Sequence, residues 1–121
     1  MRLLQPDGSL TTLARGGRMP EQLAAGHVLP PGFGIMGRAV AEGRAVMTPD
    51  ALADGATRMS DDLAQALHAA GIVAVLAVPM RAKGVIIGAL GVADMRGRVF
   101  TDAEAALLQA FADQALSLIH I

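Results

Sequence analysis

The chain has 121 residues, 53% of them hydrophobic, no cysteine, and dispersed charges that nearly cancel, ten basic against eleven acidic. This length supports one domain that buries about two-thirds of its unfolded surface, and neither a basic stripe nor clustered aromatic residues indicate a nucleic-acid partner. The longest apolar stretch, residues 69–80, is too short for a bilayer span of about 20 residues, and with no secretory signal or disulfide we expect a cytoplasmic protein without membrane contact.

The first residues predict two short strands joined by a turn. Leu3–Gln5 and Ser9–Ala14 flank Pro6-Asp7-Gly8, in which proline presets φ, aspartate bonds back to the backbone and glycine accepts a positive φ. Residues 15–20 contain two glycines and a proline and should form a loop. Residues 21–28 fit either a helical turn or irregular structure, and the sequence does not separate the two.

A constrained loop, a short helix and a strand follow. Prolines and glycines restrict residues 29–34, and Ile35–Glu42 then predicts a helix that Gly43 ends in a left-handed cap. Ala45–Thr48 predicts a short strand, which Pro49 stops because proline cannot donate to a central ladder.

The next helix is framed by two recognisable ends. Residues 50–59 predict an irregular connection, and Ser60 can cap a helix over Asp61–Ala70, whose two leading aspartates lie at its positive end. Gly71 should close this helix. Its apolar stripe consists of Leu63, Ala66, Leu67 and Ala70.

The centre of the sequence predicts a β-hairpin that is buried on both faces. The runs Ile72–Val78 and Val85–Ala93 are continuously apolar, rich in β-branched residues and too short for ordinary helices. A strand with one wet face would alternate polar and apolar residues, and these do not. The turn would be the four residues Arg81–Gly84. The expected partners across the hairpin are then Val78 with Ile87, Leu76 with Ala89 and Ala74 with Gly91.

Two glycines lie inside the second of these strands, where glycine weakens a sheet and therefore needs a reason. Gly88 and Gly91 could admit the close approach of a ligand or of another backbone. A tight contact with a helix or a β-bulge is the simpler explanation. Both explanations stay open from the sequence.

Residues 95–99 predict a polar loop, after which the last helix begins. Thr101 and Glu104 form a capping box, in which each side chain accepts a hydrogen bond from the other residue's backbone N–H. One apolar face should pack on the sheet, namely Leu107, Leu108, Phe111, Ala112, Ala115 and Leu118. Neither a cap nor a breaker ends the sequence, so we expect the helix over residues 101–120 to be truncated.

The loop before the first helix also matches a dinucleotide-binding pattern. Residues 32–37 fit G-x-G-x-x-G, and Asp50 follows the next strand, where such folds place an acid on the ribose. That fold needs a buried strand directly upstream, but Pro30 and Pro31 occupy its place. The simpler interpretation is that the glycines let a loop turn tightly into a helix packed on the sheet. A fragment of a dinucleotide-binding enzyme is a remote alternative.

Four segments, in this order and spacing, resemble the GAF domain, a small sensor module of bacterial kinases, transcription regulators, phytochromes and cyclic-nucleotide phosphodiesterases. Residues 29–40 resemble its glycine-rich entry to a short helix, and residues 43–50 resemble its strand that ends in aspartate. Residues 74–90 resemble its most recognisable segment, and residues 100–115 resemble its closing helix. The resemblance runs from Leu3 to Leu118.

The resemblance implies an α+β fold of the GAF and PAS type, a central antiparallel sheet of about six strands with helices on both faces. One face would carry the terminal helices, and the other would enclose a small-molecule pocket beneath shorter helices and loops. Residues 1–121 would form a single sensor domain that lacks the family's N-terminal helix and has a truncated C-terminal helix. In the family these helices often pair with a partner subunit and pass the signal on.

Residues that several branches of the family need are missing from this sequence. A covalent bilin and methionine sulfoxide reduction both require a cysteine, and the cyclic-nucleotide signature requires an asparagine; the sequence contains neither. Haem and iron need protein ligands, but His27, His68 and His120 lie in a loop, on a helix and at the chain end, where we expect surface or packing roles. We therefore expect no cofactor, no metal and no catalysis.

The resemblance predicts a non-catalytic regulatory domain of a bacterial-type signalling protein. It would bind a small molecule or mediate dimerisation and relay the change to a fused kinase, cyclase, phosphatase or transcription regulator. The alternative is a ligand-free spacer that forms a homodimer through the last helix. The expected ligand contacts are Met47, Asp50, Leu63, Leu67, Leu76 and Val78. Core packing competes for the apolar members of this set, and capping of a nearby loop competes for Asp50.

Overall fold

The computed structural model describes residues 1–12, 28–55 and 57–118. Within these residues, six strands form one antiparallel sheet in the order β3-β2-β1-β6-β5-β4. The strands are β1 (Arg2–Leu4), β2 (Leu10–Thr12), β3 (Val28–Leu29), β4 (Val46–Thr48), β5 (Ile72–Ala82) and β6 (Val85–Met95). The helices of the described part are α1 (Gly34–Glu42), α2 (Asp61–Ala70) and α3 (Asp102–Leu118). None of them is long and apolar enough to cross a membrane.

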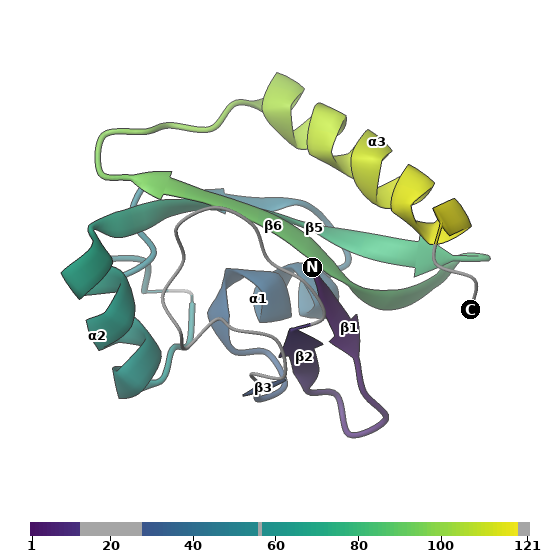
Figure 1. Ribbon diagram of the computed structural model, residues 1–121, viewed down its shortest axis with the longest axis horizontal. Helices are drawn as coiled ribbons and strands as arrows, with labels where there is room; N and C mark the ends of the chain where they lie inside the picture. Colours follow the sequence, from purple (N-terminus) through teal and green to yellow (C-terminus); the bar gives the residue numbers. More distant parts are fainter. Residues whose placement is uncertain (13–27, 56, 119–121) are drawn as a thin grey trace.

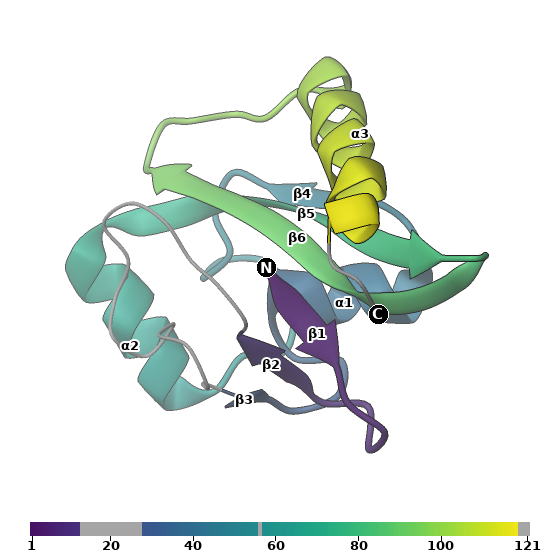
Figure 2. The same cartoon turned by 45° about the vertical axis from the view of Figure 1, so that its right-hand side comes forward.

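The two faces of the sheet carry different helices (Figure 1). α3 lies over one face, whereas α1 and α2 lie against the other, and β1, β2 and β3 curve toward the side of α1 (Figure 2). The predicted α+β architecture, an antiparallel sheet with helices on both faces, is confirmed. The two N-terminal strands are also confirmed, but β3 was not predicted. The expected loop over residues 15–20 and the segment 21–27 lie outside the described residues.

β5 is the central element, because β6 and β4 flank it and helices cover both of its faces. Every residue from Ile72 to Met80 is buried except Val75, which is half-buried. β6 is less covered, since Val85, Val92 and Met95 are exposed. Burial on both faces is therefore confirmed for β5 and only in part for β6.

The predicted register of the hairpin is wrong. The turn contains two residues, Lys83 and Gly84, both at positive φ (51° and 80°), which is the pattern of a type I′ turn. A further irregularity lies between Met80 and Arg81. The shorter turn moves the partners by two residues and the irregularity by one more, so Val78 faces Leu90 instead of Ile87. From Gly88 to Asp94 the total shift is odd, so it turns these side chains of β6 to the opposite face of the sheet.

Close packing explains both glycines inside β6. A Cβ on Gly88 would collide with the backbone carbonyl of Arg2 on β1, and one on Gly91 would collide with the methyl group of Met36 from α1. Gly91 therefore admits a helix and Gly88 admits the neighbouring strand, beside the irregularity of the hairpin ladder. The simpler explanation offered by the sequence is confirmed at Gly91.

The glycines of residues 32–37 serve a tight turn into α1. Gly32 and Gly34 have positive φ (76° and 71°), and a Cβ on Gly37 would lie 2.9 Å from the carbonyl carbon of Gly32. The loop therefore folds back onto the first turn of the helix. Their role in turning the chain, rather than in a dinucleotide-binding motif, agrees with the simpler interpretation.

The predicted helix ends are confirmed. Ser60 Oγ accepts a hydrogen bond from the N–H of Leu63 at 3.3 Å, and Gly43 and Gly71 end α1 and α2 in the left-handed conformation. In the capping box of α3, the Thr101 N–H donates to Glu104 at 3.1 Å and the Glu104 N–H donates to Thr101 at 3.2 Å. These ends depend on neighbours within three residues, which is why sequence predicts them.

The predicted apolar face of α3 is wrong in part. Leu108 and Ala112 pack on the sheet as expected, together with Ala105. Leu107 and Phe111 are 61% and 58% exposed, because these residues, four apart, lie on a flank of the helix rather than over β5. The side chains expected at residues 115 and 118 lie outside the described ones.

Alanine substitutions at the two glycines of β6 should separate a backbone contact from a side-chain contact. We expect Gly88→Ala to lower the free energy of unfolding by about 3 kcal/mol, because the carbonyl of Arg2 belongs to the sheet ladder and cannot move alone. Gly91→Ala should cost about 1 kcal/mol or less, because Met36 has rotatable bonds with which to adjust. Urea denaturation of both variants measures the difference.

Gly55→Ala is the control for this comparison, since nothing lies within 4 Å of its Cβ position and its φ is not positive. Its midpoint should stay at or slightly above that of the parent chain. Equal losses at Gly88 and Gly91 would contradict the packing described above.

Candidate ligand-binding face

The face of the sheet beneath α3 is a closed apolar layer. Leu76, Val78 and Met80 of β5 pack with three α3 residues, and every buried member of this cluster is hydrophobic. The Gln109 side-chain amide of α3 donates to the carbonyl of Pro79 at 2.9 Å. This face has the composition of an ordinary core.

The opposite face, covered by α1 and α2 and called the α1/α2 face below, is more varied. One cluster lies under α1, and a second one joins α2 to the sheet. Their buried members are Ile35, Ala39, Val46, Ala51 and Ala77 in the first and Leu10, Leu63, Leu67 and Ile72 in the second. Met36 and Met59 are half-buried and pack against both clusters. Methionine is flexible and polarisable, so this layer can adapt its shape.

Arg2 places a guanidinium group within the α1/α2 face. Arg2 lies opposite Ala89 in the ladder, and Leu4, two residues further along β1, packs in the cluster of Leu10. Side chains two apart on a strand share a face, which assigns Arg2 to the same side. The residue is 4% exposed, and its Nη1 donates to the carbonyl of Leu10 at 3.4 Å. Burial lowers the pKa of Arg2 to about 10, which leaves the group cationic at neutral pH.

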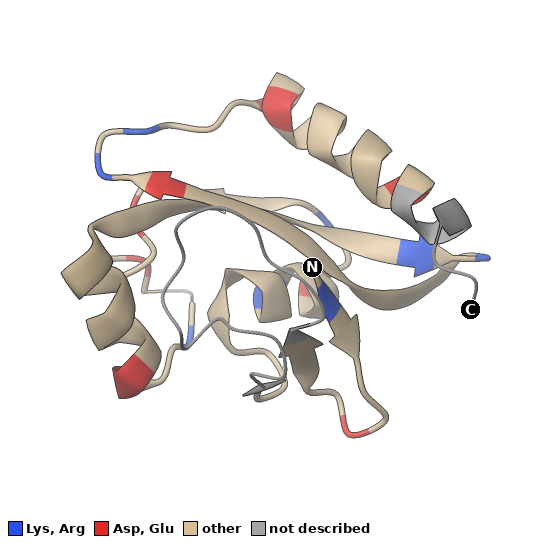
Figure 3. Cartoon of the chain, in the orientation of Figure 1, with Lys and Arg blue, Asp and Glu red and all other residues tan. Residues whose placement is uncertain are grey.

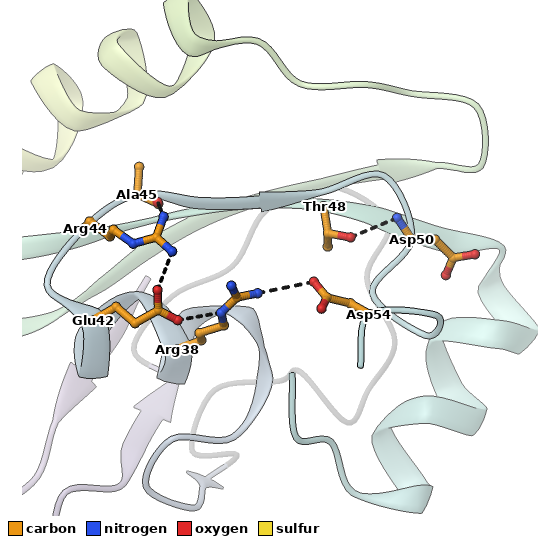
Figure 4. A network of polar contacts seen from close by, with 7 residues as sticks. All are labelled: Arg38, Glu42, Arg44, Ala45, Thr48, Asp50 and Asp54. Carbon is orange, nitrogen blue, oxygen red and sulfur yellow. Dashed lines mark hydrogen bonds and ion pairs between the residues drawn. The ribbon is translucent and has the colours of Figure 1, made fainter. Parts of the chain in front are cut away.

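A network of ion pairs joins α1 to the connection after β4 (Figure 4). Arg38 of α1 donates to Glu42 at 2.5 Å and to Asp54 at 3.3 Å, and Glu42 also contacts Arg44 at 2.5 Å. The hydrogen bond from Arg38 holds the pKa of Glu42 below its usual value and raises that of Arg38. Through the Arg38–Asp54 pair, the network ties the connection after β4 to α1.

Asp50 organises the first turn of that connection. Its Oδ1 accepts the N–H groups of Leu52 and Ala53 at 3.0 and 3.2 Å, and its Oδ2 accepts Arg96 Nη1 at 3.0 Å. Burial raises the pKa of Asp50, but the Arg96 hydrogen bond and the two backbone hydrogen bonds outweigh it and leave the pKa lowered. The carboxylate therefore stays ionised at neutral pH, as its ion pair requires.

The charged residues lie mostly at the ends of strands and helices and in the connections (Figure 3). Both signs are interspersed, and α2 and α3 each begin with acidic residues (Figure 3). Among the described residues, no group of three His, Asp or Glu side chains is placed to hold a metal ion.

The structure does not bring the six predicted site residues together. Leu76 and Val78 are buried beneath α3, and Met47 packs against the same cluster. Leu63 and Leu67 are buried on the α1/α2 face instead. The sequence-derived set thus mixes the two faces, because the residues of β5 were assigned to a side without a known register. Asp50 lies in the turn after β4 and accepts hydrogen bonds from the backbone of its own loop, which is the competing role named above.

Sequence reasoning missed Arg2, Met36 and Met59. The available signal for Arg2 was alternation: in a strand over Arg2–Leu4, the charged residue shares a face with the apolar Leu4. The two methionines gave no comparable signal, since their positions between the clusters depend on how α1 and the connection pack.

Many solved structures match nearly the whole chain, and three of them follow. Free methionine-R-sulfoxide reductase from Neisseria meningitidis, solved with its substrate, is 22% identical with a TM-score of 0.70; 92% of this chain covers 59% of that one. The GAF domain of an Acinetobacter phosphoenolpyruvate-protein phosphotransferase is 21% identical with a TM-score of 0.75, at coverages of 98% and 66%. A GAF domain/HD domain protein from Geobacter sulfurreducens is 21% identical with a TM-score of 0.73, at coverages of 98% and 76%.

These neighbours correct the expectation that the chain has no catalytic role. Free methionine-R-sulfoxide reductases from several organisms are among the matching structures, and they are enzymes. The fold shared with this chain therefore carries catalysis in those proteins, and the expectation of a non-enzyme is wrong. The chain spans less than two-thirds of the length of the Neisseria enzyme. A comparison with curated proteins finds no match.

The family comparison agrees with the sheet order and with the helices on both faces. The family model of the GAF domain matches residues 2–118, which is nearly the whole chain. The chain belongs to the GAF domain family.

Proposed function

We propose that this GAF domain is a regulatory module that binds a small anionic molecule on the α1/α2 face and relays the binding to an attached domain. The supporting observation is Arg2, a guanidinium 4% exposed on the face that also holds two adaptable methionines. The guanidinium already has partners within the protein, so an anion would exchange with one of them. Attraction between charges is stronger where water is excluded, which favours an anionic ligand. The planar donor fork of arginine suits carboxylate and phosphate groups.

The proposal includes a change of conformation on binding. Because Arg2 is almost fully buried, a ligand reaches it only when the cover of the α1/α2 face opens. This cover consists of α1, α2 and the connection of residues 49–55. A ligand that binds one arrangement of this cover more tightly shifts the population toward it. Met36 lies directly over Gly91, and its side chain can move without displacing the sheet. This supports a sensor whose face rearranges around its ligand.

A second candidate function, dimerisation, is favoured by α3. Leu107 and Phe111 are large apolar residues, both more than half exposed, and they lie side by side on the helix surface. Exposed apolar patches of this kind occur at protein–protein contacts. The contact would be with a second copy of the chain, and an attached output domain, such as a kinase, cyclase, phosphatase or transcription regulator, would follow the geometry of the pair.

Thermal-shift measurements with succinate, glutarate and inorganic phosphate at constant ionic strength test the binding proposal. We expect at least one of these anions to raise the melting temperature; binding at 100-fold excess over Kd stabilises a protein by about 2.7 kcal/mol. Arg2→Met should remove this increment, because it deletes the cation and keeps an unbranched apolar stem. The increment is compared within each variant, so a change in basal stability does not interfere.

Arg44→Met is the matched control, since Arg44 is exposed and lies on the far side of the ion-pair network. Arg44→Met should keep the full rise in melting temperature on addition of the anion. An increment that survives Arg2→Met, or no increment with any of the three anions, would contradict the proposed site.

Sedimentation equilibrium tests the second candidate. We expect Phe111→Glu to weaken self-association about 30-fold or more, as for removal of an interface hot spot worth 2 kcal/mol. Val85→Glu is the control, because Val85 is comparably exposed but belongs to the hairpin of β5 and β6 rather than to the apolar patch of α3. A parent chain that is monomeric at all accessible concentrations would exclude dimerisation through this patch.

A further inference from the structure

We propose that the connection between β6 and α3, residues 96–101, couples the cover of the α1/α2 face to α3 through two arginine–carboxylate pairs, Asp50–Arg96 and Arg98–Glu104. The inference rests on the proposed function only in taking α3 as the element that transmits the signal. The connection leaves the end of β6 near α2 and rises to the first turn of α3 on the other side of the sheet (Figure 1).

The first pair ties the connection to the α1/α2 side. Asp50 uses Oδ1 for the N–H groups of Leu52 and Ala53 and Oδ2 for the guanidinium of Arg96 at 3.0 Å. The same segment is anchored to β5 by the Ala51 N–H, which donates to the carbonyl of Val73 at 2.7 Å. One carboxylate therefore shapes the cover and holds the connection at the same time.

The second pair ties the connection to α3 in the same way. Glu104 uses Oε1 for the N–H and hydroxyl of Thr101, which is the cap of the helix, and Oε2 for the guanidinium of Arg98. Arg98 also lies over the ring of Phe100, 5.0 Å from its centroid, and Phe100 packs against the core beneath α3. The cap of α3 and the connection thus share one carboxylate.

A single residue separates the two arginines. Gly97, at φ 99°, lies between them, and the Arg98 N–H donates to the carbonyl of Met95 at 3.2 Å to close the turn. The Arg96 N–H donates to the carbonyl of Gly71 at 3.3 Å, at the end of α2. A displacement of the cover that moves Asp50 therefore also displaces Arg96 and the short, hydrogen-bonded turn at Gly97. The same turn carries Arg98, which contacts the cap of α3.

The two arginine–carboxylate pairs are better suited to coupling the cover to α3 than to stabilising the fold. Arg96 and Arg98 are exposed, and exposed ion pairs contribute little to the free energy of folding. Core packing of Leu108 and Ala112 holds α3 to the sheet without them. Their loss should change how strongly the two sides respond to each other while the fold persists. A double-mutant cycle measures this coupling directly.

Amide hydrogen exchange by NMR on the chain without ligand tests the proposal. The reporters are the amides of Leu52 and Ala53, held by Asp50, and those of Glu104 and Ala105, held by the α3 cap. Arg96→Gln should speed exchange roughly two- to fivefold at both pairs of reporters, the size expected for loss of an exposed ion pair. Arg96→Lys should restore most of the protection, because the charge is kept.

The cycle uses Arg96→Gln, Glu104→Gln and the double variant. Under the proposal the two changes are non-additive at the Leu52 and Ala53 amides, more than 40 residues from Glu104. Arg44→Gln is the control, because it removes an equally exposed arginine from an ion pair that does not involve the connection, and α3 should not respond. Additive effects, or responses confined to the mutated side, would overturn the coupling. No ligand is used, so failure of the binding proposal leaves this result unaffected.

Discussion

Burial of β5 on both faces is the constraint on which the rest of the structure depends. A strand that is buried from Ile72 to Met80 at every position but Val75 needs cover above and below. α3 on one side and α1 with α2 on the other supply it. Its backbone groups also need partners on both edges. β6 pairs along one edge, but β4 pairs only as far as Ala77 on the other. Just beyond that point, Pro79 has no backbone N–H that needs an acceptor. Its carbonyl accepts a hydrogen bond from the side-chain amide of Gln109 in α3.

The same constraint explains the difference between the two covers. α3 packs on β5 with small and branched residues, so the layer between them is filled by side chains that fit one arrangement. α1 comes close to β6 because Gly91 has no side chain and leaves room for Met36. The backbone of Gly32 lies close to the first turn of α1 because Gly37 has no side chain there. A cover held by glycine contacts and methionine can adjust, whereas the layer under α3 cannot do so without opening a void.

Local interactions made much of this fold predictable. Ser60, the Thr101–Glu104 box and the glycines that end α1 and α2 act within a few residues, and sequence alone identified them. The hairpin register was not predictable in the same way. It depends on two residues, Lys83 and Gly84, adopting positive φ and on an irregularity in the ladder, which only strand pairing determines. The three-residue error then assigned β6 side chains to the wrong face.

In the candidate site, too, local features are predictable from the sequence and long-range contacts are not. Asp50 was identified from its position after a strand, but its partner Arg96 is 46 residues away, and nothing local links the two. Leu76 and Val78 were chosen as ligand contacts because they belong to the central strand, yet their face is the one that α3 closes. Arg2 was overlooked because charge normally marks a surface position. The burial of Arg2 follows from the pairing of β1 with β6 and β2. A strand of only three residues is too short for its sequence to predict this pairing.

Fold and function separate among the structural neighbours, since a comparable fold occurs in a reductase, in the GAF domain of a phosphotransferase and in a GAF domain/HD domain protein. What distinguishes one member from another must lie in the side chains around the sheet. Here the apolar interior fixes the strands and joins α1 to the connection after β4, and the Arg38–Asp54 pair adds a second tie between them. The exposed Asp50–Arg96 pair joins that connection to the approach to α3. A rigid sheet with covers linked by weak, exposed ion pairs can change the position of one cover relative to the other at little cost in stability. That combination agrees with the proposed regulatory role.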